Sequence, residues 1–207
     1  DKPRIASRVG PAQARVAAML LLTLRGTPTL YYGDELGMEN SPIRPDQVRD
    51  PFEKNVPGKG LGRDPQRTPM QWSAAPNAGF TTGRPWLPIP GSFREVNVEA
   101  QSGDAGSMLS LYRALVALRR SEAALSIGSY EPVSADGDLL VFQRVSAGDR
   151  FAVALNLGPT PARVDLPDRF AGGRVRLSTH LDRSEALRGT TVELRADEGV
   201  IVVPAAP

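Results

Sequence analysis

The sequence has no cysteine and a single histidine, His180, among its 207 residues. The lack of cysteine excludes disulfide bonds, thiolate zinc sites and catalysis by a thiol nucleophile. It also fits a cytoplasmic protein, which is the location that we expect. No pattern of possible partners surrounds His180, so we interpret it as a surface or strand-end residue. We therefore expect neither a metal ion nor another cofactor.

Long hydrophobic runs and blocks of one charge are also missing. The longest apolar stretch, Val16 to Leu24, is shorter than the roughly 20 residues that a membrane-spanning helix needs, so we expect no membrane partner. The 25 basic and 23 acidic residues are interspersed and give a net charge of +2. Proteins that bind nucleic acid usually concentrate positive charge on one face, so the sequence also argues against nucleic acid as a partner.

The beginning of the chain has the pattern of an α/β protein. Residues 13–24 are predicted to form a helix that is apolar on most sides, and the turn from Gly26 to Pro28 ends it. A short β-prone segment, Thr29 to Tyr32, follows. Helix, tight turn and short buried strand are typical of one step in a (β/α)8 barrel. Because one strand cannot close a barrel, we expect the rest of this domain to lie upstream of residue 1.

A long loop, residues 33–102, follows this strand in the prediction. The stretch 40–92 holds 10 of the 19 prolines and therefore does not fit regular helix or strand. Its aromatic residues Trp72, Phe80 and Trp86 argue against disorder, because disordered segments are poor in aromatics. Ordered loops of this length are usually functional, so we interpret the loop as part of a site.

The hydrophobic period changes after this loop. Apolar residues at spacings of three and four from Met108 to Leu118 predict an amphipathic helix of roughly 15 residues that ends in Arg119-Arg120. From Gly128 onward the period is two, which predicts seven short strands near 129–133, 139–145, 151–156, 162–166, 174–179, 191–194 and 199–203. The predicted fold class is α/β plus all-β. Residues 1–121 form the last segment of a (β/α)8 TIM barrel, and residues 122–207 form an antiparallel β-sandwich.

Several motifs in the first 121 residues carry a family resemblance. The start, Asp1-Lys2-Pro3-Arg4, is similar to the end of the motif N-H-D-x-P-R, and 26–38 is similar to a barrel strand with its following loop. In both places the resemblance is to glycoside hydrolase family 13, at its seventh and eighth barrel strands. The longest resemblance is to the α-glucosidase and oligo-1,6-glucosidase branch, and it includes Gly62-Arg63-Asp64, Arg67-Thr68-Pro69-Met70-Gln71-Trp72 and Asn77-Ala78-Gly79-Phe80-Thr81. Ser73 departs from the branch, which often has aspartate there. Beyond residue 121 the resemblance is one of architecture only.

This resemblance implies retaining hydrolysis of terminal α-linked glucose from short oligosaccharides or disaccharides. Such chemistry needs two carboxyl groups about 5–5.5 Å apart, a nucleophile and an acid/base. In the family both belong to the fourth and fifth strands, upstream of this chain, and a third carboxylate holds sugar hydroxyls. The resemblance assigns Asp1 as that third catalytic carboxylate. It assigns Arg63 to the glucose subsite, paired with Asp1, and Arg4 as a substrate-site residue in a supporting role.

Two other functions stay open, and a third is weaker. A maltose–trehalose isomerase shares much of the pattern, although the run Asn77-Ala78-Gly79-Phe80 favours the glucosidase. A non-catalytic, amylase-like subunit of a membrane transporter keeps the barrel and loses the acids, and the presence of Asp1 and Arg63 argues against it. The third function is independent carbohydrate binding by 122–207, and it is weaker because few aromatic residues lie there.

The remaining candidate residues have structural interpretations. We expect the adjacent Asp34 and Glu35 to serve loop structure, because neighbouring side chains on an extended segment point apart. Trp72 and Trp86 could stack on sugars, but we favour a role in anchoring the loop. The expected partners are an oligosaccharide or disaccharide substrate and the missing N-terminal barrel portion of the same protein. Without that portion we expect the chain to be inactive.

Overall fold

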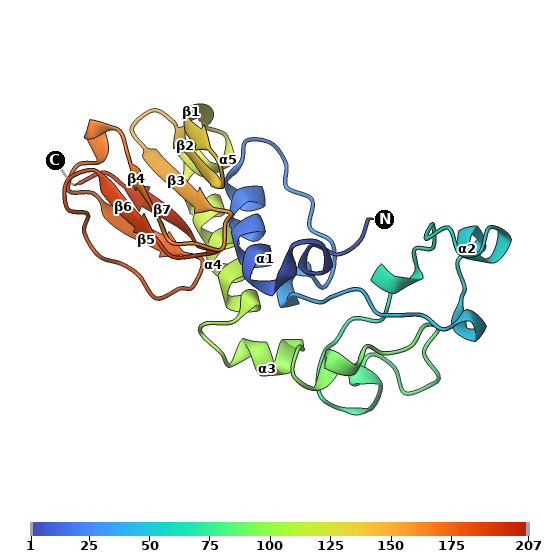
Figure 1. Cartoon of the computed structure of the whole chain (residues 1–207). Coiled ribbons are helices and arrows are strands. Elements are labelled where there is room, and N and C mark those ends of the chain that lie inside the picture. Colours follow the sequence, from blue (N-terminus) through green and yellow to red (C-terminus); the bar gives the residue numbers. More distant parts are fainter. Residues whose placement is uncertain (1, 206–207) are drawn as a thin grey trace. The chain divides into compact units, whose positions relative to one another are not determined.

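The computed structural model describes residues 2–205, and the chain divides into two compact units (Figure 1). Unit 1 comprises the chain up to Pro11 together with Leu30–Ser110. Unit 2 comprises Ala12–Thr29 and the chain from Leu111 onward. Within the described residues, every helix is too short or too polar to cross a membrane.

Unit 2 is built on two antiparallel sheets. Among the described residues, five strands pair in the order β1-β2-β3-β7-β5, and β4 pairs with β6. The bounds are β1 (Ser129–Asp136), β2 (Leu139–Val145), β3 (Arg150–Asn156), β4 (Ala162–Asp165), β5 (Arg174–Ser178), β6 (Thr191–Leu194) and β7 (Gly199–Val203). The seven predicted strands are confirmed, with the largest difference at β1, which continues to Asp136.

A core of small and branched apolar side chains lies between strands of both sheets. On β3 it is formed by Ala152 and Ala154, while the intervening Val153 faces the other way, as the period of two requires. Its buried members are Val141, Ala152, Ala154, Val164, Leu166, Phe170, Val175, Leu187, Val192, Leu194, Val200 and Val202. Two sheets joined by such a core form the antiparallel sandwich that the alternation predicted.

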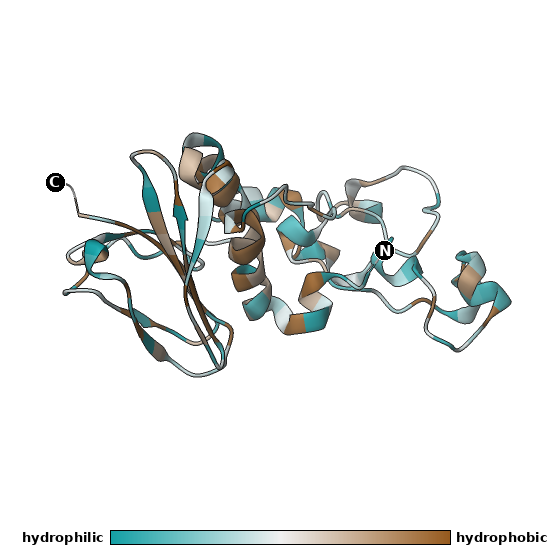
Figure 2. Cartoon of the chain, turned by 90° about the horizontal axis from the view of Figure 1, so that it is seen from above, coloured by the Kyte–Doolittle hydropathy of each residue, from teal (hydrophilic) through white to brown (hydrophobic). Residues whose placement is uncertain are grey.

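Helices cover the other face of the five-stranded sheet. They are the second part of α1 (Ile5–Thr23), most of α4 (Met108–Ser121) and α5 (Ala123–Ser126). A side chain on Gly199 of β7 would come within 2.9 Å of Met19 Sδ in α1, so helix and sheet are in close contact there. Figure 1 shows these helices along the sheet, and Figure 2 shows hydrophobic residues concentrated where they meet.

Helices α1 and α4 therefore contribute to unit 2. The predicted domains, 1–121 and 122–207, placed both helices in the first domain. The reason is that their apolar sides have the sheet to pack on, with Val16, Leu22, Leu111 and Leu115 all buried. Helix α1 also begins earlier than predicted, at Ile5, and is interrupted at Gly10, whose φ is 82°. The predicted domain boundary itself stays a prediction.

The predicted barrel strand at Thr29 to Tyr32 is not a strand in the described part of the chain. This segment is irregular and runs into a turn at Tyr32 and Gly33. A strand needs a neighbour that takes up its backbone hydrogen bonds, and the described residues supply none here. Leu30 and Tyr32 keep 45% and 40% of their surface exposed.

Unit 1 consists mainly of the long loop. Between residues 33 and 102 the structure has only short helices and no strand. They are η1 (Asp34–Leu36), η2 (Pro45–Gln47), α2 (Pro51–Asn55), η3 (Asp64–Gln66), η4 (Pro76–Gly79), η5 (Gly91–Arg94) and α3 (Val98–Ser102). A small core of Leu36, Met38, Met70 and Leu109 and buried amides hold it together. The half-buried side-chain amide of Gln101 also donates to the Leu36 carbonyl at 2.8 Å, so the loop is ordered by its own contacts.

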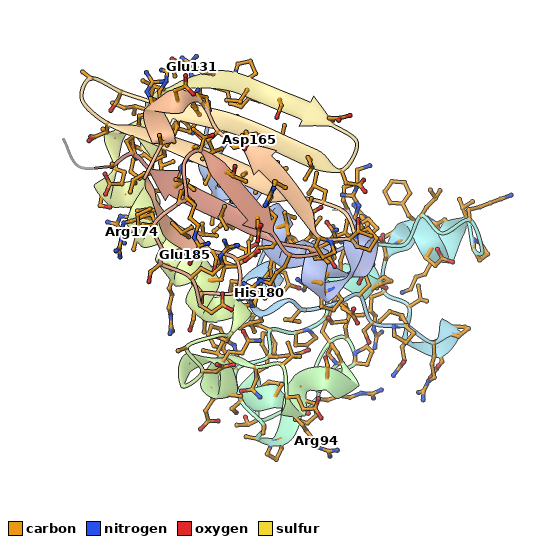
Figure 3. The ribbon with its side chains drawn as sticks, turned by 60° about the vertical axis from the view of Figure 1, so that its left-hand side comes forward. Arg94, Glu131, Asp165, Arg174, His180 and Glu185 are labelled. Atoms are coloured by element: carbon orange, nitrogen blue, oxygen red, sulfur yellow. The ribbon has the colours of Figure 1, made fainter. Side chains whose placement is uncertain are left out.

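The connection between β6 and β7 carries a fully buried carboxylate, Glu198. Its Oε2 accepts hydrogen bonds from Arg183 Nη1 at 2.9 Å and from the Arg195 backbone at 2.8 Å, and its Oε1 accepts from Arg195 Nη2 at 2.6 Å. Burial alone would raise the pKa of Glu198, but the hydrogen bonds from Arg195 and the charge of Arg183 outweigh it and lower the pKa. His180, labelled in Figure 3, lies two residues beyond β5 as a partly exposed strand-end residue, with Nδ1 3.8 Å from this carboxylate.

We expect unit 2 to lose stability in acid through Glu198. A carboxyl whose pKa is lower in the folded state stabilises the fold above its unfolded pKa, and this stability is lost as the pH falls through the folded pKa. Thermal unfolding followed by circular dichroism should therefore show a loss that begins below about pH 5. Glu198→Gln should cost about 2 kcal/mol at pH 7 and flatten the acid dependence.

Glu193→Gln is the matched control for this prediction. Glu193 pairs with Arg163 at 2.8 Å, but both side chains are largely exposed, so its replacement should change the unfolding free energy by less than about 1 kcal/mol. Equal effects of the two substitutions at pH 7 would contradict the importance that we give to the buried carboxylate.

Candidate functional site

Arg63 is held in one orientation by Asp50. Its Nε and Nη2 each donate to a different carboxylate oxygen of Asp50 at 2.8 Å, which makes a two-point pair. The Asp50 side chain has no exposed surface, whereas 32% of the Arg63 side chain is exposed. The guanidinium also lies over the Phe52 ring, with 4.8 Å between its central carbon and the ring centroid. The arginine is thus fixed on its buried side and open on the other.

Two carboxylates shape the backbone around this pair. Asp50 caps α2, where its Oδ1 accepts from the Phe52 backbone at 3.1 Å, and its Oδ2 accepts from the Arg63 backbone at 2.6 Å. Asp64 accepts in turn from the backbones of Arg49 and Asp50 at 2.6 and 2.9 Å. Two segments of the loop are therefore locked together at the site, which fixes the position of the Arg63 side chain.

The electrostatics of this pair are reciprocal. Hydrogen bonds from Arg63 hold the pKa of the Asp50 carboxyl well below its usual range, against the opposing effect of desolvation. The same hydrogen bonds raise the pKa of the Arg63 guanidinium. Asp50 therefore stays ionised, and Arg63 stays charged, at every pH near neutrality.

Arg63 lines an open hollow with a volume of about 1010 Å³, here called the Arg63 hollow. Charged residues on its wall include Lys2, Glu53, Lys54 and Arg63. Glu53 orders the rim, because its carboxylate accepts from the backbones of Gly58 at 2.9 Å and Gly62 at 3.2 Å. Among the described residues the lining is Lys2, Pro3, Asn40, Ile43, Pro45, Val48, Glu53, Lys54, Pro57, Gly58, Gly60, Leu61, Gly62, Arg63, Asp64, Pro65 and Gln66.

The predicted partner of Arg63, Asp1, lies outside the described residues, so that pair stays a prediction. Lys2 and Pro3, which follow Asp1 in the motif, do line the Arg63 hollow. Sequence reasoning missed Asp50 as the partner of Arg63. The signal available was Asp50-Pro51, an acceptor followed by proline, which is typical of a helix start and does not reveal a partner 13 residues away.

Arg4 has a supporting position. Its side chain is buried and does not line the Arg63 hollow. The guanidinium lies over the rings of Tyr31 and Tyr32, with 5.1 and 4.7 Å to the centroids, and Nη1 donates to the Tyr32 carbonyl. At Gly33 a side chain would come within 2.7 Å of Arg4 Nη1, so the turn needs glycine there. Arg4 therefore fixes the loop start, and its assignment to the substrate site stays a prediction.

The acidic pair Asp34 and Glu35 serves the loop, as expected. Glu35 Oε2 accepts from the Gly33 backbone at 2.7 Å, which closes the turn. Burial raises the pKa of Asp34, partly offset by the charge of Arg4. Among the described residues, no group of three or more histidine or acidic side chains is arranged to hold a metal ion.

The two tryptophans line a second hollow, with a volume of about 440 Å³, here called the tryptophan hollow. Trp72 and Trp86 are 50% and 68% exposed, which is too exposed for the loop anchors that we expected. Gln71, the neighbour of Trp72, is the buried residue at this point, so the chain direction turns Trp72 outward. The lining is Tyr32, Glu35, Arg67, Pro69, Met70, Trp72, Phe80 and Trp86.

Known proteins resemble the chain over both its parts. Residues 1–128 match the family described as alpha amylase, catalytic domain, and residues 126–202 match a domain of unknown function, DUF3459. Trehalose-6-phosphate hydrolase of Bacillus subtilis is 31% identical over 97% of this chain and 40% of its own length. A probable oligo-1,6-glucosidase of the same species is 34% identical over 81% of this chain and 34% of its length.

Solved structures agree with these matches. Trehalulose synthase MutB from Pseudomonas mesoacidophila superposes with a TM-score of 0.84 and 31% identity, covering 99% of this chain and 42% of its own. Isomaltulose synthase from a Klebsiella species has a TM-score of 0.87 and 29% identity, over 99% and 41%. The chain spans less than half the length of these relatives. Because more than half of it matches the catalytic domain, the chain belongs to the α-amylase family.

Proposed function

We propose that the protein containing this chain removes terminal α-linked glucose from short oligosaccharides or disaccharides, with retention of configuration. Family membership and the relatives named as glucosidases support this reaction. The observation that carries the proposal is the Arg63 guanidinium, held by a buried carboxylate on the wall of an open hollow. The nucleophile and the acid/base would come from the preceding portion of the same protein.

In this proposal the chain holds the sugar while the preceding portion breaks the bond. The pair with Asp50 uses two of the five N–H donors of Arg63, and donors beyond this pair would bind sugar hydroxyls. Donors that do not have to reorient during the reaction stabilise the transition state more than mobile ones do. Asp1 would accept from hydroxyls as the third carboxylate. Arg4 would act as a positioning residue, and the protein would work in the cytoplasm.

Isomerisation of a disaccharide is the second candidate. It is favoured by the superposition on trehalulose and isomaltulose synthases, with TM-scores of 0.84 and 0.87. Both reactions break a glucosidic bond and differ in whether water or a sugar hydroxyl attacks next. Residues of the preceding portion would contribute to that choice, so the two candidates share the role of Arg63.

The proposed reaction can be tested with the longer protein, which includes the portion before residue 1. We expect glucose release from isomaltose and p-nitrophenyl α-glucoside, and proton NMR at early times should show the α anomer first. The 207-residue chain alone should release none. Appearance of the β anomer first would contradict retention. Conversion of sucrose to isomers without glucose release would favour the second candidate.

A further inference from the structure

We propose that the tryptophan hollow binds a glucosyl unit of an α-linked oligosaccharide. It contains both tryptophans of the chain together with Tyr32 and Phe80, and these four rings are 40% to 68% exposed. Exposed aromatic rings gathered in one concave site usually mark a ligand. The choice of sugar rests on the proposed function, whereas the existence of a ligand site rests on the hollow itself.

The lining has the two kinds of group that a sugar ring needs. A pyranose has apolar C–H faces, which pack on aromatic rings, and hydroxyls around its edge, which need donors and acceptors. Glu35 and Arg67 supply charged groups of both signs among the aromatic residues. Glu35 Oε2 already accepts from the Gly33 backbone, but a carboxylate has further lone pairs for hydroxyl donors. A volume of about 440 Å³ is in the range of small-ligand sites.

Backbone hydrogen bonds order the segment that carries Trp72 and leads to Phe80 before any ligand binds. The N–H groups of Trp72 and Ser73 both donate to the Ala78 carbonyl, at 2.9 and 3.1 Å, and the Trp72 carbonyl accepts from Glu99 at 3.0 Å. These bonds tie the backbone that carries Trp72 to the turn before Phe80. A preformed site loses less entropy on binding than a mobile one, so even a weak sugar contact can become measurable.

The turn between Trp72 and Phe80 is also strained. Asn77 and Ala78 both have a left-handed backbone, with φ of 53° and 55°. For residues other than glycine this conformation is unfavourable and persists where the surrounding structure imposes it. The Asn77 amide supplies that support, since it donates to the carbonyls of Thr81 at 3.1 Å and Gly83 at 3.0 Å. Strain of this kind is concentrated at binding sites, which agrees with a ligand in the hollow.

Tryptophan fluorescence tests the proposal directly, because the only two indoles of the chain line this hollow. Titration of the 207-residue chain with isomaltotriose or maltotriose should give a saturable change with a Kd near 1 mM, about what a few stacking contacts provide. Trp86→Ala should weaken binding about 10-fold, with Trp72 as the remaining reporter, and Trp86→Phe should retain most of the affinity. Tyr130→Ala, an exposed ring of unit 2, is the control and should change nothing.

Several outcomes would overturn the proposal. They are the absence of a saturable change, an equal change with the open-chain polyol sorbitol, and full affinity in Trp86→Ala. Indoles shielded from acrylamide in the longer protein would show that another part of the polypeptide fills the hollow, and would also overturn it. The fluorescence titration measures binding and does not require hydrolysis. The binding result can therefore be judged even if the proposed hydrolysis is not found. If hydrolysis occurs, Trp86→Ala should raise KM for isomaltotriose with little change in kcat.

Discussion

Arg63→Lys is expected to lower kcat/KM for isomaltose about 100-fold in the longer protein, because lysine cannot replace a two-point hydrogen-bonding fork. Lysine keeps the positive charge but presents a single ammonium. It could satisfy the buried Asp50 or reach the sugar, but not both in the geometry that the guanidinium has. Each good hydrogen bond to a charged group that is lost costs about tenfold in rate.

Steady-state kinetics with a matched substitution would check this result. Arg44→Lys is the control, because Arg44 forms a similar pair with Asp46 but both side chains are largely exposed and solvated. We expect kcat/KM of this control to stay within about twofold of the parent. Equal losses in the two variants, or full activity of Arg63→Lys, would contradict the role of Arg63 at the sugar.

Arg144→Met is expected to lower the free energy of unfolding of unit 2 by about 3 kcal/mol, because it leaves three backbone carbonyls without their donor. Arg144 is fully buried and donates to the carbonyls of Thr23, Gly128 at 2.9 Å and Ser129 at 3.2 Å. It thereby joins the end of α1 to the start of β1. Burial lowers the pKa of Arg144, with help from the charge of Arg119. The hydrogen bonds to these carbonyls therefore offset most of the cost of burying the charged guanidinium.

Urea unfolding of the variant would measure this loss. Arg163→Met is the matched control: Arg163 has a strand position in the same unit, but it is exposed and pairs with the exposed Glu193. Its effect should stay below about 1 kcal/mol. A similar change in both variants would show that the buried carbonyls find other donors, water included, and would contradict the argument.

Much of unit 2 was predictable because its signals are local. Alternating apolar residues identify a strand whichever neighbour it pairs with, and turn residues such as Asp136-Gly137 mark where one strand ends. Gly137 has a φ of 54°, a conformation that glycine adopts without strain. The helices beside the sheet were predicted as helices but not as part of this unit, because a pattern of apolar residues does not reveal what covers it.

The candidate site was predictable only in part. Arg63 was recognised through the motif around it, whereas Asp50 was not, because their contact depends on how 13 residues of loop turn back. The sequence was equally unable to predict which single side chains of the loop are buried. Trp72 and Gln71 are neighbours in one motif, yet Gln71 is buried and Trp72 is half exposed. The predicted strand at Thr29 to Tyr32 failed for a related reason, since a strand is a property of two segments and not of one.

By itself the sequence determined the family resemblance, the prediction of Arg63 as a site residue and the number and places of the strands of unit 2. These depend on residue types at short spacings, which act through local backbone preferences and the side-chain period. Only the tertiary structure decided that Asp50 orients Arg63, that the helices cover the sheet and that both tryptophans face one hollow. Each of these is a contact between distant segments, whose free energy depends on burial and geometry that no local pattern contains.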